Sequence, residues 1–350
     1  MKIFLTGATG FIGIPLTHFL AGLGHSVRLL SRPASDLTPF AGLPVEVRPG
    51  DVLDQGSLSD ALRGCDAVFH LAGYAKNWAK DPGTFFRVNV LGLRNVLKAA
   101  RRNSVLRIVF TSTSVTFGPS SGRPVTESDV RSVAFFTEYE RTKYLAEQEA
   151  VRHVRSGLDV VMVNPTRVFG PGALTESNSV TKMIHLYLRG QWRLVLGSGR
   201  AVGNYAFIDD VVKGHWLALQ HGRPGEKYIL GGDNLDYEGF FRTLTSVSRC
   251  RRRMAHVPPQ LALAVSKLEA LRASRFGHYP LITPSWLRTF LADWAFSSEK
   301  AQRELGYRTK PFARAVEETV RWLRPSPTPQ RSPDHESLDR FPESVHPLQV

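Results

Sequence analysis

A tyrosine and a lysine stand four residues apart in the stretch YERTK, at Tyr139 and Lys143. On a helix, side chains at this spacing share one face. A phenol is normally too weak an acid to exchange a proton near neutral pH, and a neighbouring ammonium lowers its pKa by stabilising the phenolate. The pair could therefore pass a proton to or from a carbonyl oxygen. Taken alone, the pattern is common and is better explained as a surface contact.

Four hydroxyl residues, TSTS at 111–114, follow an apolar segment at 106–110 that we predict to be a strand. Ligands bind at the carboxyl ends of the strands in a parallel α/β sheet. The alternative is that these hydroxyl residues only cap a helix or stabilise a turn, which is their ordinary role. Because predicted strands at 106–110 and 160–163 bracket a predicted helix at 137–155, these hydroxyls and Tyr139 could converge.

Glycines recur at every third position in the opening sequence MKIFLTGATGFIG, at Gly7, Gly10 and Gly13. The apolar run 3–5 before them predicts a buried strand, and the apolar spacing after them predicts a helix. A helix start offers free N–H groups and a positive dipole end, and glycines let a pyrophosphate approach the backbone. A plain tight turn is the alternative, but the strand–turn–helix context favours a dinucleotide site.

Apolar runs predict six strands, and several of them are separated by segments with helical periodicity. The predicted strands are 3–5, 26–30, 45–48, 67–71, 106–110 and 160–163, and the predicted helices include 58–62, 81–102 and 137–155. This alternation implies right-handed crossovers and a parallel sheet covered on both faces. The predicted fold class is α/β, a doubly wound parallel sheet of the Rossmann type with a smaller mixed C-terminal lobe.

The pattern loosens near residue 164, and it predicts a division of the chain. We expect a dinucleotide-binding Rossmann domain over 1–165 and a mainly substrate-binding lobe over 166–324, with a part at about 205–230 returning to the main domain. The last segment, 325–350, is rich in Pro, Ser and charge, and we expect a disordered tail there.

The formal net charge of +14 raises the question of a nucleic-acid or membrane partner. Most Arg and Lys residues are scattered, and neither a helix-turn-helix nor a zinc pattern is present, so we expect no nucleic acid. A basic cluster at 249–253 precedes a predicted amphipathic helix at 259–275. A solvated basic face explains it better than a peripheral membrane contact.

The compartment is predicted from what the chain does not contain. No apolar run approaches the length of a membrane-spanning helix, and the N-terminus does not resemble a signal peptide. The two cysteines, Cys65 and Cys250, lie far apart and form neither a disulfide framework nor a metal motif. We therefore expect a cytoplasmic protein without a metal site.

Together, these motifs resemble those of the extended short-chain dehydrogenase/reductases, the NAD(P)-dependent epimerase/dehydratase superfamily. The resemblance follows the family's order over roughly residues 1–230. The matching segments are TGATGFIG (6–13), GDVLD (50–54), FHLAG (69–73), VNVLGLRNVLKAA (88–100), VFTSTSVTFG (109–118), YERTKYLAE (139–147), NPTRVFGPG (164–172) and FIDDVV (207–212).

The resemblance implies roles for the matched residues. Tyr139 would be the catalytic acid/base, Lys143 would tune it and bind the nicotinamide ribose, and Thr113 aligns with the catalytic Ser/Thr position. Ser112 and Ser114 take that position if the alignment shifts by one residue. The implied cofactor-binding residues are Gly7, Thr9, Gly10, Phe11, Ile12, Gly13, Arg32, Asp51, Val52, Leu71, Ala72, Gly73, Tyr139, Lys143, Asn164 and Pro165.

The end of the second predicted strand bears on the choice of cofactor. An acid there would hydrogen-bond the ribose hydroxyls of NAD. The strand instead ends LSRP, and Arg32 offers a planar fork that matches a phosphate. Asp36 is the competing acid, but it lies beyond Pro33. We therefore predict NADP, with NAD as the second choice.

Within the family, two details favour an oxidoreductase over a nucleotide-sugar enzyme. Epimerases keep NAD bound, and sugar-nucleotide members typically place an arginine where this chain has Gly203, with Arg200 near but offset. NPTRVFGPG and NYAFIDD look more like dihydroflavonol reductases and 3β-hydroxysteroid dehydrogenases. We predict an NADP-dependent enzyme that interconverts a ketone or aldehyde and a secondary alcohol on a bulky, fairly apolar small molecule.

Two alternatives stay open at this point. One is an NAD-dependent nucleotide-sugar epimerase or dehydratase. The other is a non-catalytic NADP-binding sensor or structural subunit, although such proteins tend to lose the tyrosine or the lysine. The family also often forms homodimers through two helices, here 81–102 and 137–155. Candidates for an apolar substrate pocket, each more often a core residue, are Tyr74, Trp78, Met183, Tyr187 and Trp192.

Overall fold

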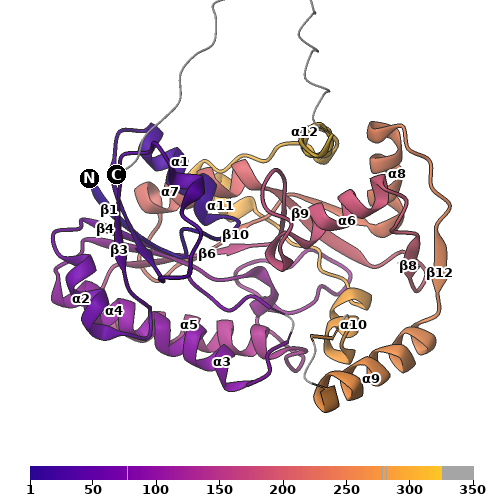
Figure 1. The fold of residues 1–350 in the computed structure, drawn as a ribbon, viewed down its shortest axis with the longest axis horizontal. Coiled ribbons are helices and arrows are strands. Elements are labelled where there is room, and N and C mark those ends of the chain that lie inside the picture. The colour runs from indigo at the N-terminus through magenta and orange to yellow at the C-terminus, as the bar shows by residue number, and fades with distance from the viewer. Residues whose placement is uncertain (77, 277–278, 281, 325–350) are drawn as a thin grey trace, which may run out of the picture.

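A computed structural model describes residues 1–76, 78–276, 279–280 and 282–324. In this part of the chain, seven parallel strands form the central sheet in the order β10-β6-β5-β4-β1-β2-β3 (Figure 1). The strands are β1 (Lys2–Thr6), β2 (Ser26–Ser31), β3 (Val45–Pro49), β4 (Ala67–His70), β5 (Arg107–Thr111), β6 (Val160–Pro165) and β10 (Lys227–Leu230). The predicted doubly wound α/β fold is confirmed.

Alternating side chains divide the two faces of this sheet. Phe4 packs with helices α2, α4 and α5, whereas its neighbours Ile3 and Leu5 pack with α1, α7 and α11 on the opposite face. All three side chains have no exposed surface, as expected for a parallel strand covered on both sides. The helices are α1 (Gly13–Gly22), α2 (Gln55–Leu62), α3 (Gly83–Phe86), α4 (Gly92–Arg102), α5 (Glu138–Arg155), α7 (Ile208–His221) and α11 (Glu299–Leu305).

The helix predicted over 81–102 contains a wide turn. α3 runs through a π-helical turn, Arg87–Leu91, into α4. Such turns mark functional sites in many helices. Here the turn holds Asn89, which accepts the Tyr74 N–H (2.7 Å) and donates to Thr142 Oγ1 (3.0 Å). Asn89 therefore ties the segment after β4 to helix α5, which carries Tyr139 and Lys143.

The second half of the chain builds a smaller, mixed part beside the carboxyl ends of β5 and β6. Its strands and helices are β7 (Arg167–Phe169), α6 (Ser179–Leu188), β8 (Leu194–Leu196), β9 (Val202–Phe207), β11 (Asp233–Asp236), α8 (Tyr237–Ser248), β12 (Ala255–Val257), α9 (Pro259–Phe276), α10 (Pro284–Leu291) and α12 (Phe312–Leu323). β9 lies between β11 and β7 in a three-stranded sheet, and β8 pairs with β12. Between β9 and β11 the chain returns to the main sheet, because β10 pairs with β6.

Three predictions concern the rest of the chain. The helix predicted at 259–275 is present as α9. The tail predicted at 325–350 lies outside the described residues. Over the residues that the structure does describe, we find no helix that combines the length and the hydrophobicity needed to span a lipid bilayer.

Candidate active site

Tyr139 lies in the first turn of α5, two residues after the helix cap. Thr137 is that cap, and its hydroxyl accepts the Glu140 N–H (3.1 Å). The Thr113 side chain, which follows β5, lies close enough to the Tyr139 hydroxyl to lower its pKa. The geometry thus brings together the two predicted catalytic hydroxyls.

Burial raises the pKa of Tyr139 to about 12, and the nearby Thr113 side chain offsets this rise only partly. This direction is opposite to the one predicted from the Tyr–Lys spacing, because desolvation disfavours the phenolate. Tyr139 is therefore a neutral phenol, and a proton donor, at physiological pH.

Lys143 lies one turn further along α5 and is 4% exposed. Its Nζ atom donates to the main-chain oxygen of Thr111 (2.7 Å) and lies over the ring of Phe110, 4.5 Å from the ring centroid. Burial lowers the pKa of Lys143 to about 8, against a smaller opposing effect of Glu147. A Cβ on Gly73 would come within 3.8 Å of Nζ, so the ammonium lies close to the segment that follows β4.

The buried carboxylate of Glu147 is hydrogen-bonded to the hydroxyl segment 111–116. It accepts hydrogen bonds from Ser112 Oγ (2.5 Å), Thr116 Oγ1 (3.0 Å), Asn164 Nδ2 (2.7 Å) and Lys227 Nζ (2.6 Å). Ser112 thus points to Glu147, and Thr113 is the hydroxyl that meets Tyr139. The alternative assignment of the catalytic position to Ser112 does not fit this geometry.

Asn164 and Pro165 are the last two residues of β6, which pairs with β5. Asn164 has no exposed surface, and its amide donates to the main-chain oxygen of Thr113 (3.0 Å). The structure therefore makes the Asn164 side chain a support for Thr113. The predicted contact of Asn164 and Pro165 with the nicotinamide stays a prediction.

The glycine turn between β1 and α1 has the shape of an anion cradle. Gly7 has a φ of +72°, and a Cβ there would lie 2.5 Å from the Ala72 N atom. A Cβ on Gly13 would lie 2.2 Å from the Gly7 oxygen, so neither position admits a side chain. No side chain caps the start of α1 and its first turn carries no acid, which leaves the positive end open. These residues fit the pyrophosphate of a dinucleotide.

The other predicted cofactor residues follow neighbouring strands at the same sheet edge. Leu71, Ala72 and Gly73 follow β4, and Asp51 and Val52 follow β3. The turn between β1 and α1 also contains Thr9, Phe11 and Ile12.

Arg32 follows β2 directly, and its side chain is exposed. The competing acid, Asp36, accepts hydrogen bonds from the Thr38 N–H (2.9 Å) and hydroxyl (2.7 Å). These bonds lower the pKa of Asp36, and they direct its carboxylate to Thr38, two residues away. Arg32 is therefore the charged side chain that directly follows the strand.

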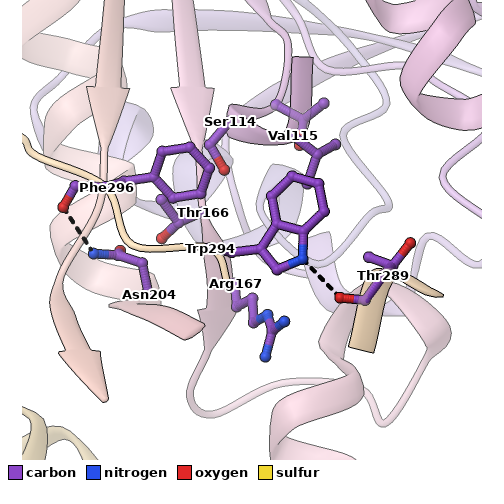
Figure 2. Close-up of a pocket in the computed structure, with 9 residues that line it drawn as sticks. Ser114, Val115, Thr166, Arg167, Asn204, Thr289, Trp294 and Phe296 are labelled. Atoms are coloured by element: carbon purple, nitrogen blue, oxygen red, sulfur yellow. Dashed lines mark hydrogen bonds between the residues drawn. The ribbon is translucent and has the colours of Figure 1, made fainter. Parts of the chain in front are cut away.

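A cavity of ≈ 60 Å³ lies beside Thr113 (Figure 2). Trp294 and Phe296 form apolar walls, and the Trp294 indole is fixed by its hydrogen bond to the Thr289 oxygen (2.6 Å). The full lining is Thr113, Ser114, Val115, Thr166, Arg167, Asn204, Thr289, Trp294 and Phe296. Most of the accessible surface inside the cavity belongs to apolar atoms, and Arg167 is the one charged side chain among the described lining residues.

Sequence reasoning missed several of these residues. None of the five apolar candidates is among the described residues that line the cavity, and Met183 and Tyr187 are buried in the core. Trp294 and Phe296 replace them, and their alternation in ADWAFSS was the available signal. Glu147 and Arg167 lie within the recognised segments YERTKYLAE and NPTRVFGPG, but spacing alone does not show what they contact.

Comparison with known proteins gives matches over most of the chain. The NAD dependent epimerase/dehydratase family matches residues 3–231. A Synechocystis sp. protein provisionally named dihydroflavonol 4-reductase is 31% identical and covers 91% of this chain and 94% of its own length. A 3-beta-hydroxysteroid dehydrogenase from Mycolicibacterium neoaurum is 26% identical, with 87% of this chain and 86% of that protein covered.

Solved structures agree with this assignment. A dTDP-glucose 4,6-dehydratase from Streptomyces venezuelae, solved with NAD bound, has a TM-score of 0.75 at 25% identity and covers 93% of this chain and 97% of that one. The predicted resemblance is thus confirmed by both kinds of comparison. The chain belongs to the NAD dependent epimerase/dehydratase family, the extended short-chain dehydrogenase/reductases, and is an oxidoreductase.

Proposed function

We propose that the protein is an NADP-dependent reductase of a ketone or aldehyde carbonyl on a bulky, fairly apolar molecule. The observation that carries this proposal is the closeness of the Thr113 and Tyr139 side chains, with Thr113 lining a cavity that has aromatic walls. The names of the relatives, a dihydroflavonol reductase and a steroid dehydrogenase, support the same class of substrate.

The chain's own residues supply the proton and the orientation. NADPH, when bound, would supply a hydride for the carbonyl carbon. Tyr139 gives its phenolic proton to the carbonyl oxygen, which becomes the alcohol, and Thr113 holds that oxygen through its hydroxyl. Because burial keeps the phenol protonated, Tyr139 is in the form that reduction requires.

The apolar walls support the substrate class. Val115, Trp294 and Phe296 face the cavity, and apolar contacts with a small number of placed polar groups are typical of small-molecule sites. Arg32 supports NADP over NAD, because a guanidinium can bind a 2′-phosphate with two parallel hydrogen bonds.

Two measurements test this proposal. NADPH and NADH titrations, followed by fluorescence, should show tighter binding of NADPH. Bulky ketones, such as a dihydroflavonol and a 3-oxosteroid, should then drive oxidation of NADPH. Tyr139→Phe should bind NADPH normally and lose turnover by about 10²–10⁴-fold.

Tyr144→Phe is the matched control, because it removes a hydroxyl from the same helix at a position where the structure shows only a ring contact with Phe135. It should retain turnover. Protein that purifies with NAD bound and acts on nucleotide sugars would contradict the proposal and support the epimerase or dehydratase alternative.

A further inference from the structure

Arg167 is the one charged residue among the described residues that line the cavity. It begins β7 and lies beside Trp294 in Figure 2. Its guanidinium is surrounded by three aromatic rings, with centroid distances of 5.8 Å to Tyr205, 5.8 Å to Tyr237 and 5.4 Å to Phe290. The guanidinium therefore lies in apolar surroundings, where its electrostatic attraction to an anion would be stronger than in water.

Within the described part of the chain, no carboxylate forms an ion pair with Arg167. Its hydrogen bonds go from Nη1 to the hydroxyls of Tyr237 (3.1 Å) and Tyr205 (3.5 Å). Burial raises the pKa of both tyrosines, so both are neutral at physiological pH. The nearby Asp236 carboxylate instead accepts the Gly239 N–H at the start of α8 (2.7 Å). Among the described residues, the positive charge of Arg167 is thus left without a compensating negative charge.

Gly203 on β9 makes room for this guanidinium. A Cβ at Gly203 would lie 2.6 Å from Arg167 Nη1 and 2.9 Å from the Tyr205 hydroxyl oxygen. A side chain at position 203 would therefore displace the arginine head. The structure keeps an unpaired cation at the cavity by leaving that space free.

A second polar group beside Arg167 also lacks a partner. The Thr166 hydroxyl is buried, lines the same cavity and makes no hydrogen bond to any described residue. A buried polar atom without a partner is unfavourable unless a ligand or water satisfies it. A hydroxyl donor next to an unpaired guanidinium matches the acceptor oxygens of an anion.

We propose that Arg167, assisted by Thr166, binds a carboxylate on the substrate, so that the enzyme reduces oxo acids. This inference rests on the proposed function and specifies its substrate class. A nucleoside diphosphate is the other source of anionic oxygens, but Arg167 is the single cation among the described lining residues. One guanidinium balances one carboxylate, and a diphosphate would leave negative charge unbalanced near Trp294 and Phe296.

The pairing would also orient the substrate. Thr113 and Arg167 line the same cavity, so a molecule held at both points presents its carbonyl to Tyr139 and lays its apolar part against Trp294. Fixing two points of a substrate raises the rate by restricting its orientation.

The test compares medium-chain 3-oxo and 4-oxo acids with their methyl esters as substrates of the full-length protein with NADPH. The ester keeps the size and the ketone and removes the charge. We expect wild-type kcat/KM to favour the acid by about 10–100-fold, the range for a charge-assisted hydrogen bond. Arg167→Gln should bring the ratio near 1, and Arg167→Lys should give an intermediate ratio because lysine lacks the fork.

Two further variants separate recognition from folding. Gly203→Ala retains the charge of Arg167 but displaces its guanidinium group. This variant should lower the ratio of kcat/KM for the acid to kcat/KM for the ester. Arg200→Gln removes an exposed arginine near the start of β9 and should retain the wild-type ratio. Tyr139→Phe should abolish turnover of acid and ester alike, which tests the proposed function independently.

The outcomes are distinct. Equal ratios in wild type and Arg167→Gln, or a wild-type preference for the ester, would overturn this inference and leave the reductase proposal standing. If no ketone is reduced, the reductase proposal fails, and carboxylate binding is then tested by calorimetry of the oxo acids with the NADPH-loaded protein. Binding that Arg167→Gln abolishes supports the inference. No binding overturns the inference. Arg167-dependent binding of UDP or dTDP, without binding of the acids, would show diphosphate recognition instead.

Discussion

The Lys143 ammonium donates a 2.7 Å hydrogen bond to the main-chain oxygen of Thr111, the last residue of β5. One side chain of α5 thus contacts the strand end from which the hydroxyl segment begins. The ammonium is almost fully buried, and no carboxylate within the described residues forms an ion pair with it. Its charge is therefore held at the site at the expense of stability.

This burial predicts a specific dependence of stability on pH. The Lys143 pKa is about 8 in the folded protein, against an ordinary value of 10.5. Between these values the unfolded chain binds the additional proton, so the free energy of unfolding should rise with pH, by at most about 1.4 kcal/mol per pH unit. Urea unfolding of wild type and Lys143→Met from pH 7 to 10 should show wild type gaining stability relative to the variant.

Lys98→Met is the control for this experiment, because Lys98 is exposed on α4. It should follow wild type across the whole range. Parallel curves for wild type and Lys143→Met would show that Lys143 is not desolvated.

A second prediction concerns cofactor choice and rests on the proposed use of NADP. Arg32→Gln should weaken NADPH binding by about 10–100-fold, the effect of losing a charge-assisted hydrogen bond, and leave NADH binding unchanged. Fluorescence titration measures both constants. Arg63→Gln, at an exposed position after α2, should change neither. An equal loss for both cofactors would mean that Arg32 does not discriminate between them.

The Glu147–Lys227 ion pair gives a prediction about stability. The Glu147 side chain has no exposed surface, and Lys227 lies 2.6 Å from it. Lys227→Met leaves this charge without its cation, and should destabilise the protein by about 3–5 kcal/mol in urea unfolding. Glu138→Gln breaks an exposed pair on the same helix, with Arg141, and should cost about 0–1 kcal/mol. Similar losses for the two variants would contradict the assigned importance of burial.

The glycine turn predicts a contrast between two alanine substitutions. Gly13→Ala puts a Cβ against the main chain at Gly7, and should lower stability by about 1–3 kcal/mol and weaken dinucleotide binding. Gly22→Ala, at the end of the same helix, meets no atom within 4 Å and should stabilise by about 0.4–1 kcal/mol. Thermal unfolding with and without NADPH measures both effects. Normal NADPH binding by Gly13→Ala would exclude close packing of this turn.

Sequence patterns predicted the elements whose signal is local. The run of buried residues in β1 and the helical spacing after Gly13 are each complete within a few residues, and both elements are present. The spacing of Tyr139 and Lys143 also places both correctly on α5. What spacing could not show is desolvation, and for that reason the direction of the Tyr139 pKa shift was predicted wrongly.

Features that depend on distant parts of the chain were less predictable. Arg167 gains its significance from Gly203, Tyr205 and Tyr237 on other elements. Trp294 and Phe296 reach the cavity from a segment far along the chain. The roles of Asp51 and Val52 at the adenine stay predictions, because they depend on contacts with the cofactor.

The position of β10 has a consequence for how the protein is made. When the ribosome has synthesised the chain only through β6, that strand is the open edge of an unfinished sheet, and its sequence VVMVNP is almost wholly apolar. The edge is covered only after the intervening segment and Lys227–Leu230 have emerged. During this interval the nascent protein therefore exposes an unpaired strand edge that is prone to aggregation. We expect a fragment ending at residue 165 to keep this edge exposed and to aggregate.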